Sequence, residues 1–510
     1  MTTGAERLVT ALADAGVAAC FANPGTSEMH LVTALDREPR IRSVLCLFEG
    51  VATGAADGYA RIAGKPAMTL LHLGSGLTNA GANLHNARRA RSPMVNVIGD
   101  HATYHLQYDA PLTSDIAALA RPNVVWTTTV GSAAEAGGAG AAAAAAARTL
   151  QGPVAVILPA DSAWTDSEAA TAATVAGAPA PAIDVAQAAV AVKAARKPMV
   201  LINGTATVEP GLSSAARLDA AGIGVVTDTF LWRQARGAGR FAPRRLAYFA
   251  EMALADLDGV DLLVLAGTQP PAAFFAYPGK PSLLVPEGCA TLTLCMPGED
   301  AGAALDALAD ALGAPAKGRV ADRVTPPAPA GPLSATDVGV SLTRHLPEAA
   351  IVADDGVTAG LPIFSLTTGA APHDWLFLTG GAIGIGMPLA VGAAVAAPSR
   401  KVVCLSGDGA GMYTNQALWT MARERLDVLT IVFANRSYRI LNIEMARTGA
   451  GNPGPTASAM LSLDNPPIDW VRLAEAQGVP AARCETAEHF DALFARMVTD
   501  KGPGLIEAVV

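Results

Sequence analysis

Asp408, in a Gly-Asp-Gly turn, and Asn435, 27 residues later, are the pair of positions in this chain whose types and spacing could do chemistry. Each follows a short apolar run, residues 401–406 and 428–434, and these runs are predicted to be neighbouring parallel strands joined by a helix. Open α/β sheets bind ligands at the carboxyl ends of such strands. A carboxylate, an amide oxygen and backbone carbonyls suit Mg²⁺, which phosphate oxygens usually complete. The pattern indicates a metal-bridged diphosphate; a strand-end turn with a helix-capping aspartate is the alternative.

Glu49 is a second chemical candidate, between an apolar run and a helical segment rich in glycine and alanine. No basic residue lies within five positions of it. Such surroundings favour the protonated form of a carboxyl group, which makes it useful for proton exchange. The alternative is a glutamate that starts a helix and complements its dipole, and the local sequence favours this alternative.

Three segments are expected to position these residues, because 510 residues are too many for one core. Residues 168–184 and 313–334 are rich in alanine and proline and fit inter-domain connections. They divide the chain into 1–167, 185–312 and 335–510. Each segment alternates strand-like and helix-like stretches, which predicts an α/β fold with three doubly wound parallel sheets. Three of the expected strands are residues 153–158, 198–202 and 261–266.

Composition excludes several classes of protein. The net charge is −9 without a basic block, which argues against a nucleic-acid partner. No stretch is predicted to span a membrane or to act as a signal peptide, and the alanine-rich residues 137–147 are too short for a bilayer. The six cysteines form no CxxC pair and no metal spacing, and a cytoplasmic protein with reduced thiols is expected.

Four motifs occur in the same order as in a known enzyme superfamily: Asn-Pro-Gly-Thr (23–26), the Glu-Gly-Val-Ala…Tyr-Ala-Arg run (49–61), Gly-Ala-Ile-Gly-Ile-Gly-Met-Pro (381–388) and Gly-Asp-Gly…Asn. Together they resemble the thiamin diphosphate enzymes that include acetolactate synthase, benzoylformate decarboxylase and pyruvate decarboxylase. The closest resemblance is to acetolactate synthase large subunits, and it covers essentially the whole chain. It implies a pyrimidine-binding domain, a central domain, and a domain that binds the diphosphate and Mg²⁺, in the order of the three segments.

The resemblance implies a role for each matching residue. Glu49 would bond N1′ of the aminopyrimidine, the carbonyl of Gly381 would accept from the 4′-amino group, and Ile383 would wedge between the two rings. Asp408, Asn435 and the carbonyl of Ser437 would bind the metal ion. The remaining cofactor contacts implied are Thr358, Gly407, Gly409 and Ala410, although Ala410 replaces the serine that is usual in the family.

Substrate contacts follow from the same resemblance. Thr26 and His72 correspond to the active-site serine and a histidine of benzoylformate decarboxylase, while Phe274 and its neighbours replace that enzyme's second histidine. His101 and His105 are candidates near the entrance, and solvated loop histidines are the alternative.

The segment after Asn435 is expected to line the pocket with Ile440, Leu441 and Glu444. Leu441 stands where pyruvate decarboxylases carry a glutamate that handles protons on the way to free aldehyde. A surface glutamate is the alternative for Glu444.

These expectations describe an enzyme that decarboxylates a 2-oxo acid and ligates the resulting enamine to a carbonyl acceptor. The rivals are a decarboxylase that releases aldehyde and a non-catalytic homologue that binds the cofactor only structurally. FAD is not expected, because the central segment has no dinucleotide fingerprint, and 381–388 lacks the GxGxxG order of an NAD site. The family architecture implies a homodimer or homotetramer whose active sites are shared between chains.

Overall fold

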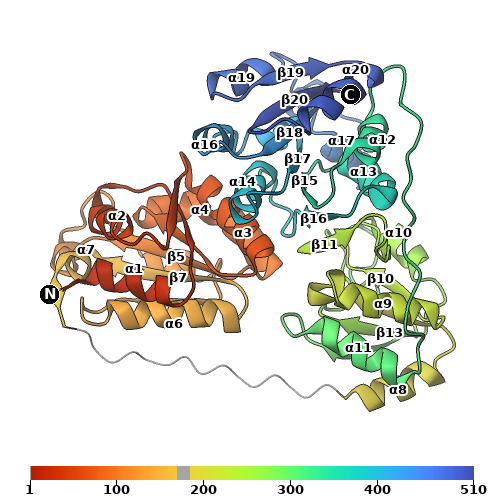
Figure 1. Cartoon of the computed structure of the whole chain (residues 1–510), viewed down its shortest axis with the longest axis horizontal. Helices are drawn as coiled ribbons and strands as arrows, with labels where there is room; N and C mark the ends of the chain where they lie inside the picture. Colours follow the sequence, from red (N-terminus) through yellow and green to blue (C-terminus); the bar gives the residue numbers. More distant parts are fainter. Residues whose placement is uncertain (1, 169–183) are drawn as a thin grey trace.

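Three sheets, parallel except for one edge strand, organise the chain in the computed structural model, which describes residues 2–168 and 184–510. In Figure 1 the N-terminal sheet lies at the lower left, the central sheet at the lower right, and the C-terminal sheet above both. The predicted connection at residues 168–184 lies almost entirely outside the described residues. The α/β class expected from the alternation of strands and helices is confirmed.

The N-terminal sheet has six strands in the order β3-β2-β4-β5-β7-β6, and every neighbouring pair is parallel. Its strands are β2 (Ala19–Ala22), β3 (Arg42–Leu45), β4 (Ala67–Leu71), β5 (Met94–Asp100), β6 (Trp126–Thr129) and β7 (Pro153–Pro159). The helices are α1 (Gly4–Asp14), α2 (Met29–Asp36), α3 (Glu49–Ala63), α4 (Leu73–Ala90), α5 (Ile116–Ala120), α6 (Ala136–Thr149) and α7 (Ala160–Trp164), with 3₁₀ turns η1 (Thr26–Glu28) and η2 (Thr103–Tyr108). Two short strands, β1 (Thr2–Thr3) and β8 (Asp166–Ser167), pair antiparallel beside it.

The central sheet has five parallel strands in the order β12-β10-β9-β13-β14. These are β9 (Pro198–Ile202), β10 (Gly224–Thr227), β12 (Arg244–Arg245), β13 (Leu262–Ala266) and β14 (Ala290–Cys295). Its helices are α8 (Val185–Ala194), α9 (Gly211–Ala220), α10 (Ala250–Asp256) and α11 (Ala301–Ala311), with the 3₁₀ turn η3 (Gly204–Thr207).

The C-terminal sheet has seven strands in the order β11-β16-β15-β17-β18-β20-β19. Its strands are β11 (Arg233–Arg236), β15 (Ala350–Asp355), β16 (His373–Phe377), β17 (Val402–Gly407), β18 (Val428–Ala434), β19 (Ala481–Cys484) and β20 (Gly504–Val509). The helices are α12 (Ala335–His345), α13 (Gly360–Leu366), α14 (Gly386–Ala396), α15 (Asp408–Gly411), α16 (Ala417–Arg423), α17 (Arg439–Arg447), α18 (Pro455–Leu461), α19 (Trp470–Ala476) and α20 (Ala487–Met497), with the 3₁₀ turn η4 (Thr367–Gly369).

One strand departs from the expected division of the chain. β11 belongs to the predicted central segment, but it pairs antiparallel with β16 at the edge of the C-terminal sheet. Residues 313–334 contain no helix or strand and run along the side of the molecule from the central to the C-terminal part (Figure 1). Both features tie the central part to the C-terminal sheet, which local periodicity does not reveal.

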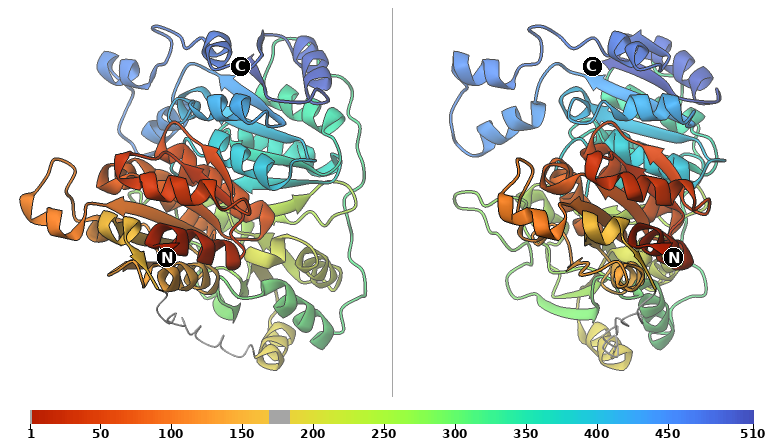
Figure 2. Two further views of the ribbon diagram at one scale, coloured as in Figure 1. Left: turned by 60° about the vertical axis from the view of Figure 1, so that its left-hand side comes forward. Right: turned by 90° about the vertical axis from the view of Figure 1, so that its left-hand side faces the viewer.

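The N-terminal and C-terminal parts meet through α3 and α14, which Figures 1 and 2 show side by side. α14 is buried along nearly its whole length, as expected for a helix that is apolar on all faces. The two backbones approach so closely that a Cβ on Gly392 would lie 1.8 Å from the carbonyl oxygen of Ala55. Glycine is therefore required at this crossing.

Among the described residues, no helix is both long and apolar enough to cross a membrane. The six cysteines are unpaired; five are buried and Cys289 is half-buried.

Candidate active site

Four adjacent strands of the C-terminal sheet, in the order β16-β15-β17-β18, present the predicted cofactor residues at one edge. Parallel strands bring their carboxyl ends together, so residues far apart in sequence become neighbours. Gly381 and Ile383 follow β16, and Thr358 follows β15. Gly407 ends β17, and Asp408, Gly409 and Ala410 come directly after it. Asn435 and Ser437 follow β18. The predicted strands at 401–406 and 428–434 are confirmed as β17 and β18, which pair in parallel.

Asp408 touches the turn that carries Asn435 and Ser437. Its Oδ2 accepts from the backbone N–H of Arg436 at 2.6 Å, and its Oδ1 accepts from that of Gly409 at 2.8 Å. Asn435 Oδ1 accepts from the N–H of Ser437 at 3.0 Å, which folds the turn back on itself. The carboxylate and the amide oxygen therefore face one short stretch of backbone.

The donor set of this edge fits a hard cation and a diphosphate. Asp408 is only 4% exposed, and burial raises the pKa of its carboxyl group. Within the part of the chain that the structure describes, Asp408 forms no ion pair, and the nearby Arg436 pairs with Asp464. A bound cation would therefore offset the cost of burying this charge. Within the same described residues, no group of three or more His, Cys, Asp or Glu side chains could hold a metal ion. A site with one carboxylate, an amide and a carbonyl suits Mg²⁺ completed by phosphate oxygens.

Two glycines in this edge lie against aromatic rings. A Cβ on Gly409 would come within 2.5 Å of the Tyr438 ring, and one on Gly381 within 2.4 Å of the Phe274 ring. Gly381 also has φ of +78°, a conformation that residues with a Cβ rarely adopt. Glycine is therefore required at both positions, because a Cβ would collide with the aromatic ring.

Glu49 starts α3, and its side chain is nearly buried. Its Oε2 accepts from Asn79 Nδ2 at 3.0 Å, and its Oε1 lies 3.1 Å from the position of a Cβ on Gly76. His72 lies on the same side of Gly76, with its Cβ 3.4 Å from that position. The neutral amide of Asn79 holds the Glu49 carboxyl in place without adding a charge.

The predicted substrate residues gather at the carboxyl edge of the N-terminal sheet. Thr26 follows β2, His72 follows β4 and His101 follows β5, and these three strands are neighbours. Thr26 is exposed at the start of η1. His101 rests on His105, with ring centroids 5.4 Å apart, and its Nε2 is buried without a hydrogen-bond partner.

His72 is held by a buried carboxylate that the sequence reasoning missed. Its Nδ1 lies 2.8 Å from Glu28 Oε2, and Glu28 is fully buried. Glu28 also accepts from the N–H of Gly25 at 2.8 Å and from the hydroxyl of Ser27 at 2.6 Å. The sequence signal that could have indicated this contact is an acidic residue, Glu28, in the short turn that follows β2.

Helix α17 exposes residues of its first turn and turns Glu444 towards the central part. Leu441 is 46% exposed and Ile440 is half-buried. Glu444 is half-buried against the central part, where its Oε2 accepts from the Tyr277 hydroxyl at 2.5 Å. The same carboxylate and burial raise the pKa of Tyr248 to about 12, with burial the larger cause. The Glu444 carboxylate thus accepts a hydrogen bond from Tyr277. Glu444 is half-buried and is not the exposed surface residue considered as an alternative.

Family models match both ends of the chain. Residues 2–120 match the N-terminal TPP binding domain of thiamine pyrophosphate enzymes, and residues 365–508 match the C-terminal TPP binding domain. A protein of Mycobacterium tuberculosis named "Putative acetolactate synthase large subunit IlvX" is 52% identical over 99% of both chains. The chain belongs to the thiamine pyrophosphate enzyme family. It is therefore a thiamin diphosphate-dependent enzyme, as the four motifs indicated.

Other members of the thiamine pyrophosphate enzyme family are more distant. Benzoylformate decarboxylase of Pseudomonas aeruginosa is 28% identical over 96% of both chains. In structure, the thiamine diphosphate-dependent 4-hydroxybenzoylformate decarboxylase of Rhodococcus jostii RHA1 superposes with a TM-score of 0.84 at 24% identity, covering 100% of this chain and 99% of that one. The last comparison supports the fold alone.

Proposed function

We propose that this enzyme decarboxylates a 2-oxo acid and joins the remaining acyl group to a second carbonyl compound. The observation that carries this proposal is the position of Glu444. It is the one acidic residue of α17, and its carboxylate is bound to Tyr277, while Leu441 occupies the exposed first turn. The name of the relative that is 52% identical, an acetolactate synthase large subunit, supports the same reaction.

Mg²⁺ and the diphosphate group are assigned to the carboxyl edge of the C-terminal sheet. Asp408, Asn435 and the carbonyl of Ser437 would bind the metal ion. The diphosphate would lie against Thr358, Gly407, Gly409 and Ala410. When bound, thiamin diphosphate supplies the electron sink that decarboxylation requires.

The protein's own task at the other end of the cofactor is to orient it and to place a proton. Glu49 would hold a proton against N1′ of the pyrimidine, and Asn79 fixes the direction of its carboxyl group. Ile383 would support the bent shape that brings the 4′ nitrogen close to the thiazolium. Thr26, His101 and the apolar residues Ile440 and Leu441 would surround the substrate and exclude water.

Release of free aldehyde is the second candidate, and the pair of His72 and Glu28 favours it. Nδ1 of His72 lies within hydrogen-bond distance of Glu28, and this contact fixes the orientation of the imidazole, a side chain that can serve as a general acid. Donation of a proton from His72, in place of reaction with the acceptor, would give aldehyde. The two candidates differ in whether this proton or an acceptor carbonyl arrives first.

A shared site between two copies of the chain is part of the proposal. The carboxyl edges of the N-terminal and C-terminal sheets expose large apolar side chains, which a second copy would cover. On the N-terminal edge these are Met29, Leu47, Tyr104 and Tyr108, and on the C-terminal edge Met412, Tyr413 and Leu441. We expect a homodimer or homotetramer in the cytoplasm, where unpaired cysteines stay reduced. Light scattering of the purified protein measures the assembly.

Product analysis tests the proposed reaction. The enzyme, loaded with thiamin diphosphate and Mg²⁺, is given a panel of 2-oxo acids with and without a carbonyl acceptor, and both products are separated by chromatography. We expect hydroxyketone to exceed free aldehyde when the acceptor is present. Aldehyde in excess at every acceptor concentration would replace the first candidate by the second.

A further inference from the structure

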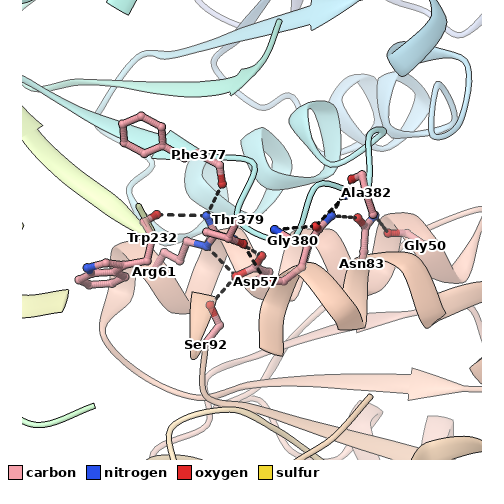
Figure 3. Close-up of polar contacts among 11 residues, drawn as sticks. Gly50, Asp57, Arg61, Asn83, Ser92, Trp232, Phe377, Thr379, Gly380 and Ala382 are labelled. Carbon is pink, nitrogen blue, oxygen red and sulfur yellow. Dashed lines mark hydrogen bonds and ion pairs between the residues drawn. The ribbon is translucent and has the colours of Figure 1, made fainter. Parts of the chain in front are cut away.

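A buried polar seam joins α3 and α4 to the segment Phe377–Ala382, which carries Gly381. Figure 3 shows polar contacts of this seam. Asn86 of α4, which is completely buried, makes four of its hydrogen bonds. Asn86 Oδ1 accepts from the N–H of Gly380 at 3.1 Å and from that of Ala382 at 3.3 Å. Its Nδ2 donates to the carbonyl of Ala382 at 2.8 Å and to Asn83 Oδ1 at 3.0 Å. One carboxamide therefore holds the backbone on both sides of Gly381.

These contacts determine where the carbonyl of Gly381 points. That carbonyl and the N–H of Ala382 belong to the same peptide plane, and in a trans peptide they point in opposite directions. Because the N–H of Ala382 points at Asn86, the carbonyl of Gly381 points away from α4. The aim of the carbonyl is thus determined by a side chain that does not touch it.

The rest of the seam keeps this segment in place. Arg61 donates to the carbonyl of Phe377 at 2.7 Å and to Thr379 Oγ1 at 3.1 Å, and Asp57 neutralises its charge in a fully buried ion pair at 2.5 Å. Thr379 in turn donates to the backbone carbonyl of Asn86 at 2.8 Å. Buried polar groups that are fully paired in this way define a single arrangement.

The seam continues along one face of α4 to Glu49. Asn79, Asn83 and Asn86 are spaced by four and three residues, which places them on the same side of a helix. Asn79 holds the Glu49 carboxyl, and Asn83 donates to the carbonyl of Gly50 at 2.7 Å. The same helix face therefore contacts Glu49 and the backbone on both sides of Gly381, the two residues that we assign to the aminopyrimidine.

We propose that Asn86 is a positioning residue that aims the carbonyl of Gly381 at the 4′-amino group of thiamin diphosphate. This inference rests on the proposed role of Gly381. Asn86 acts before the cofactor arrives, because its hydrogen bonds are made within the protein. It contributes to affinity for the amino group and not to affinity for the diphosphate.

Calorimetric titration with three ligands tests this assignment in the presence of Mg²⁺: thiamin diphosphate, its analogue lacking the 4′-amino group, and inorganic diphosphate. We expect the wild-type protein to prefer thiamin diphosphate over the analogue by about tenfold, the value of one well-formed hydrogen bond. Asn86→Ala should lose most of that preference while binding inorganic diphosphate as before.

Two variants serve as controls. Asn96→Ala removes another fully buried asparagine of the N-terminal sheet, which bonds Thr69 and the carbonyl of Val154, and it should keep the wild-type preference. Asn86→Asp keeps an acceptor for both N–H groups and should retain part of the preference. A folded Asn86→Ala protein with the full wild-type preference would overturn the inference.

Hydrogen exchange of the wild-type protein tests the inference without any variant. The N–H groups of Gly380 and Ala382 should be protected in the cofactor-free protein, because Asn86 already binds them. Exchange as fast as in an unstructured peptide would show that the segment is not pre-aimed and would refute the proposal. Absence of any thiamin diphosphate binding by the wild type would instead overturn the cofactor assignment itself, and this inference with it.

Discussion

The carboxyl edges of the N-terminal and C-terminal sheets share one topology and differ in chemistry. The N-terminal edge offers titratable side chains that hydrogen bonds hold in place: Glu49 with Asn79, and His72 with Glu28. The C-terminal edge offers the side-chain oxygens of Asp408 and Asn435 as ligands, together with the backbone of glycines that pack against aromatic rings. The fold determines where a site forms, and the residue types after each strand determine its chemistry. One edge suits proton transfer and the other suits a metal-bound anion.

Glu49→Gln is the sharpest test of the proton-handling edge. Glutamine keeps the shape and the contact with Asn79 but cannot exchange the proton. We expect thiamin diphosphate to stay bound while exchange of its C2 hydrogen for deuterium slows by about 10² to 10⁴, the usual contribution of a general acid–base group. Nuclear magnetic resonance of quenched samples measures the exchange. Glu38→Gln, at another little-exposed glutamate, is the control, and unchanged exchange in Glu49→Gln would remove Glu49 from the mechanism.

Asp408→Ala tests the metal-binding edge. Without this carboxylate the diphosphate would face no firmly held cation, and the Kd for thiamin diphosphate in the presence of Mg²⁺ should rise by roughly two orders of magnitude or more. Calorimetry measures the Kd. Asp427→Ala, at the opposite end of β18 where Asp427 pairs with Lys401, should leave the Kd unchanged. Normal affinity in Asp408→Ala would exclude Asp408 as the metal ligand.

Leu441→Glu would bring a proton donor to the edge that lacks one. The exposed first turn of α17 can accept the new side chain without burying a charge. We expect the ratio of aldehyde to hydroxyketone to rise about tenfold, below the full contribution of an evolved acid. Chromatography at several acceptor concentrations measures both products, with Leu441→Gln as the uncharged control. A ratio that does not respond in either variant would show that Leu441 is remote from the reacting carbon.

Asp355→Asn gives the smallest expected effect and concerns a carboxyl group at the end of β15. Burial raises the pKa of Asp355 from 3.8 to about 7. The folded protein therefore binds a proton that the unfolded chain has lost, and the free energy of unfolding falls as pH rises from about 4 to about 7. Asp355→Asn should remove the part of this slope that Asp355 contributes, which amounts to a Tm shift of several degrees at most.

Thermal unfolding of the cofactor-free protein between pH 4 and pH 8 measures that slope. Asp109→Asn, in an exposed loop, is the matched control and should unfold like the wild type at each pH. A pH dependence of Tm that is the same in Asp355→Asn and in the wild type would mean that Asp355 is ionised in the fold.

The apolar runs of the sequence predicted much of the carboxyl edge of the C-terminal sheet, because its candidate residues directly follow strands. β18 has the predicted bounds, and β17 is shifted by one residue from its predicted bounds. Asp408 and Asn435 meet because parallel neighbours bring their carboxyl ends together, which follows from the order of strands. The assignments to cofactor and substrate atoms remain predictions that the variants above test.

The sequence by itself determined the family, the α/β class and the strand ends that carry the candidate residues, since apolar periodicity and short motifs are local properties. Only the tertiary structure decided which groups pair across long distances: Glu28 with His72, Asn86 with the backbone beside Gly381, and Tyr277 with Glu444. β11 likewise joined a sheet that its place in the chain did not indicate. Such contacts depend on how finished helices and sheets pack, because a side chain buried between them takes whichever partner the packing brings within hydrogen-bond distance.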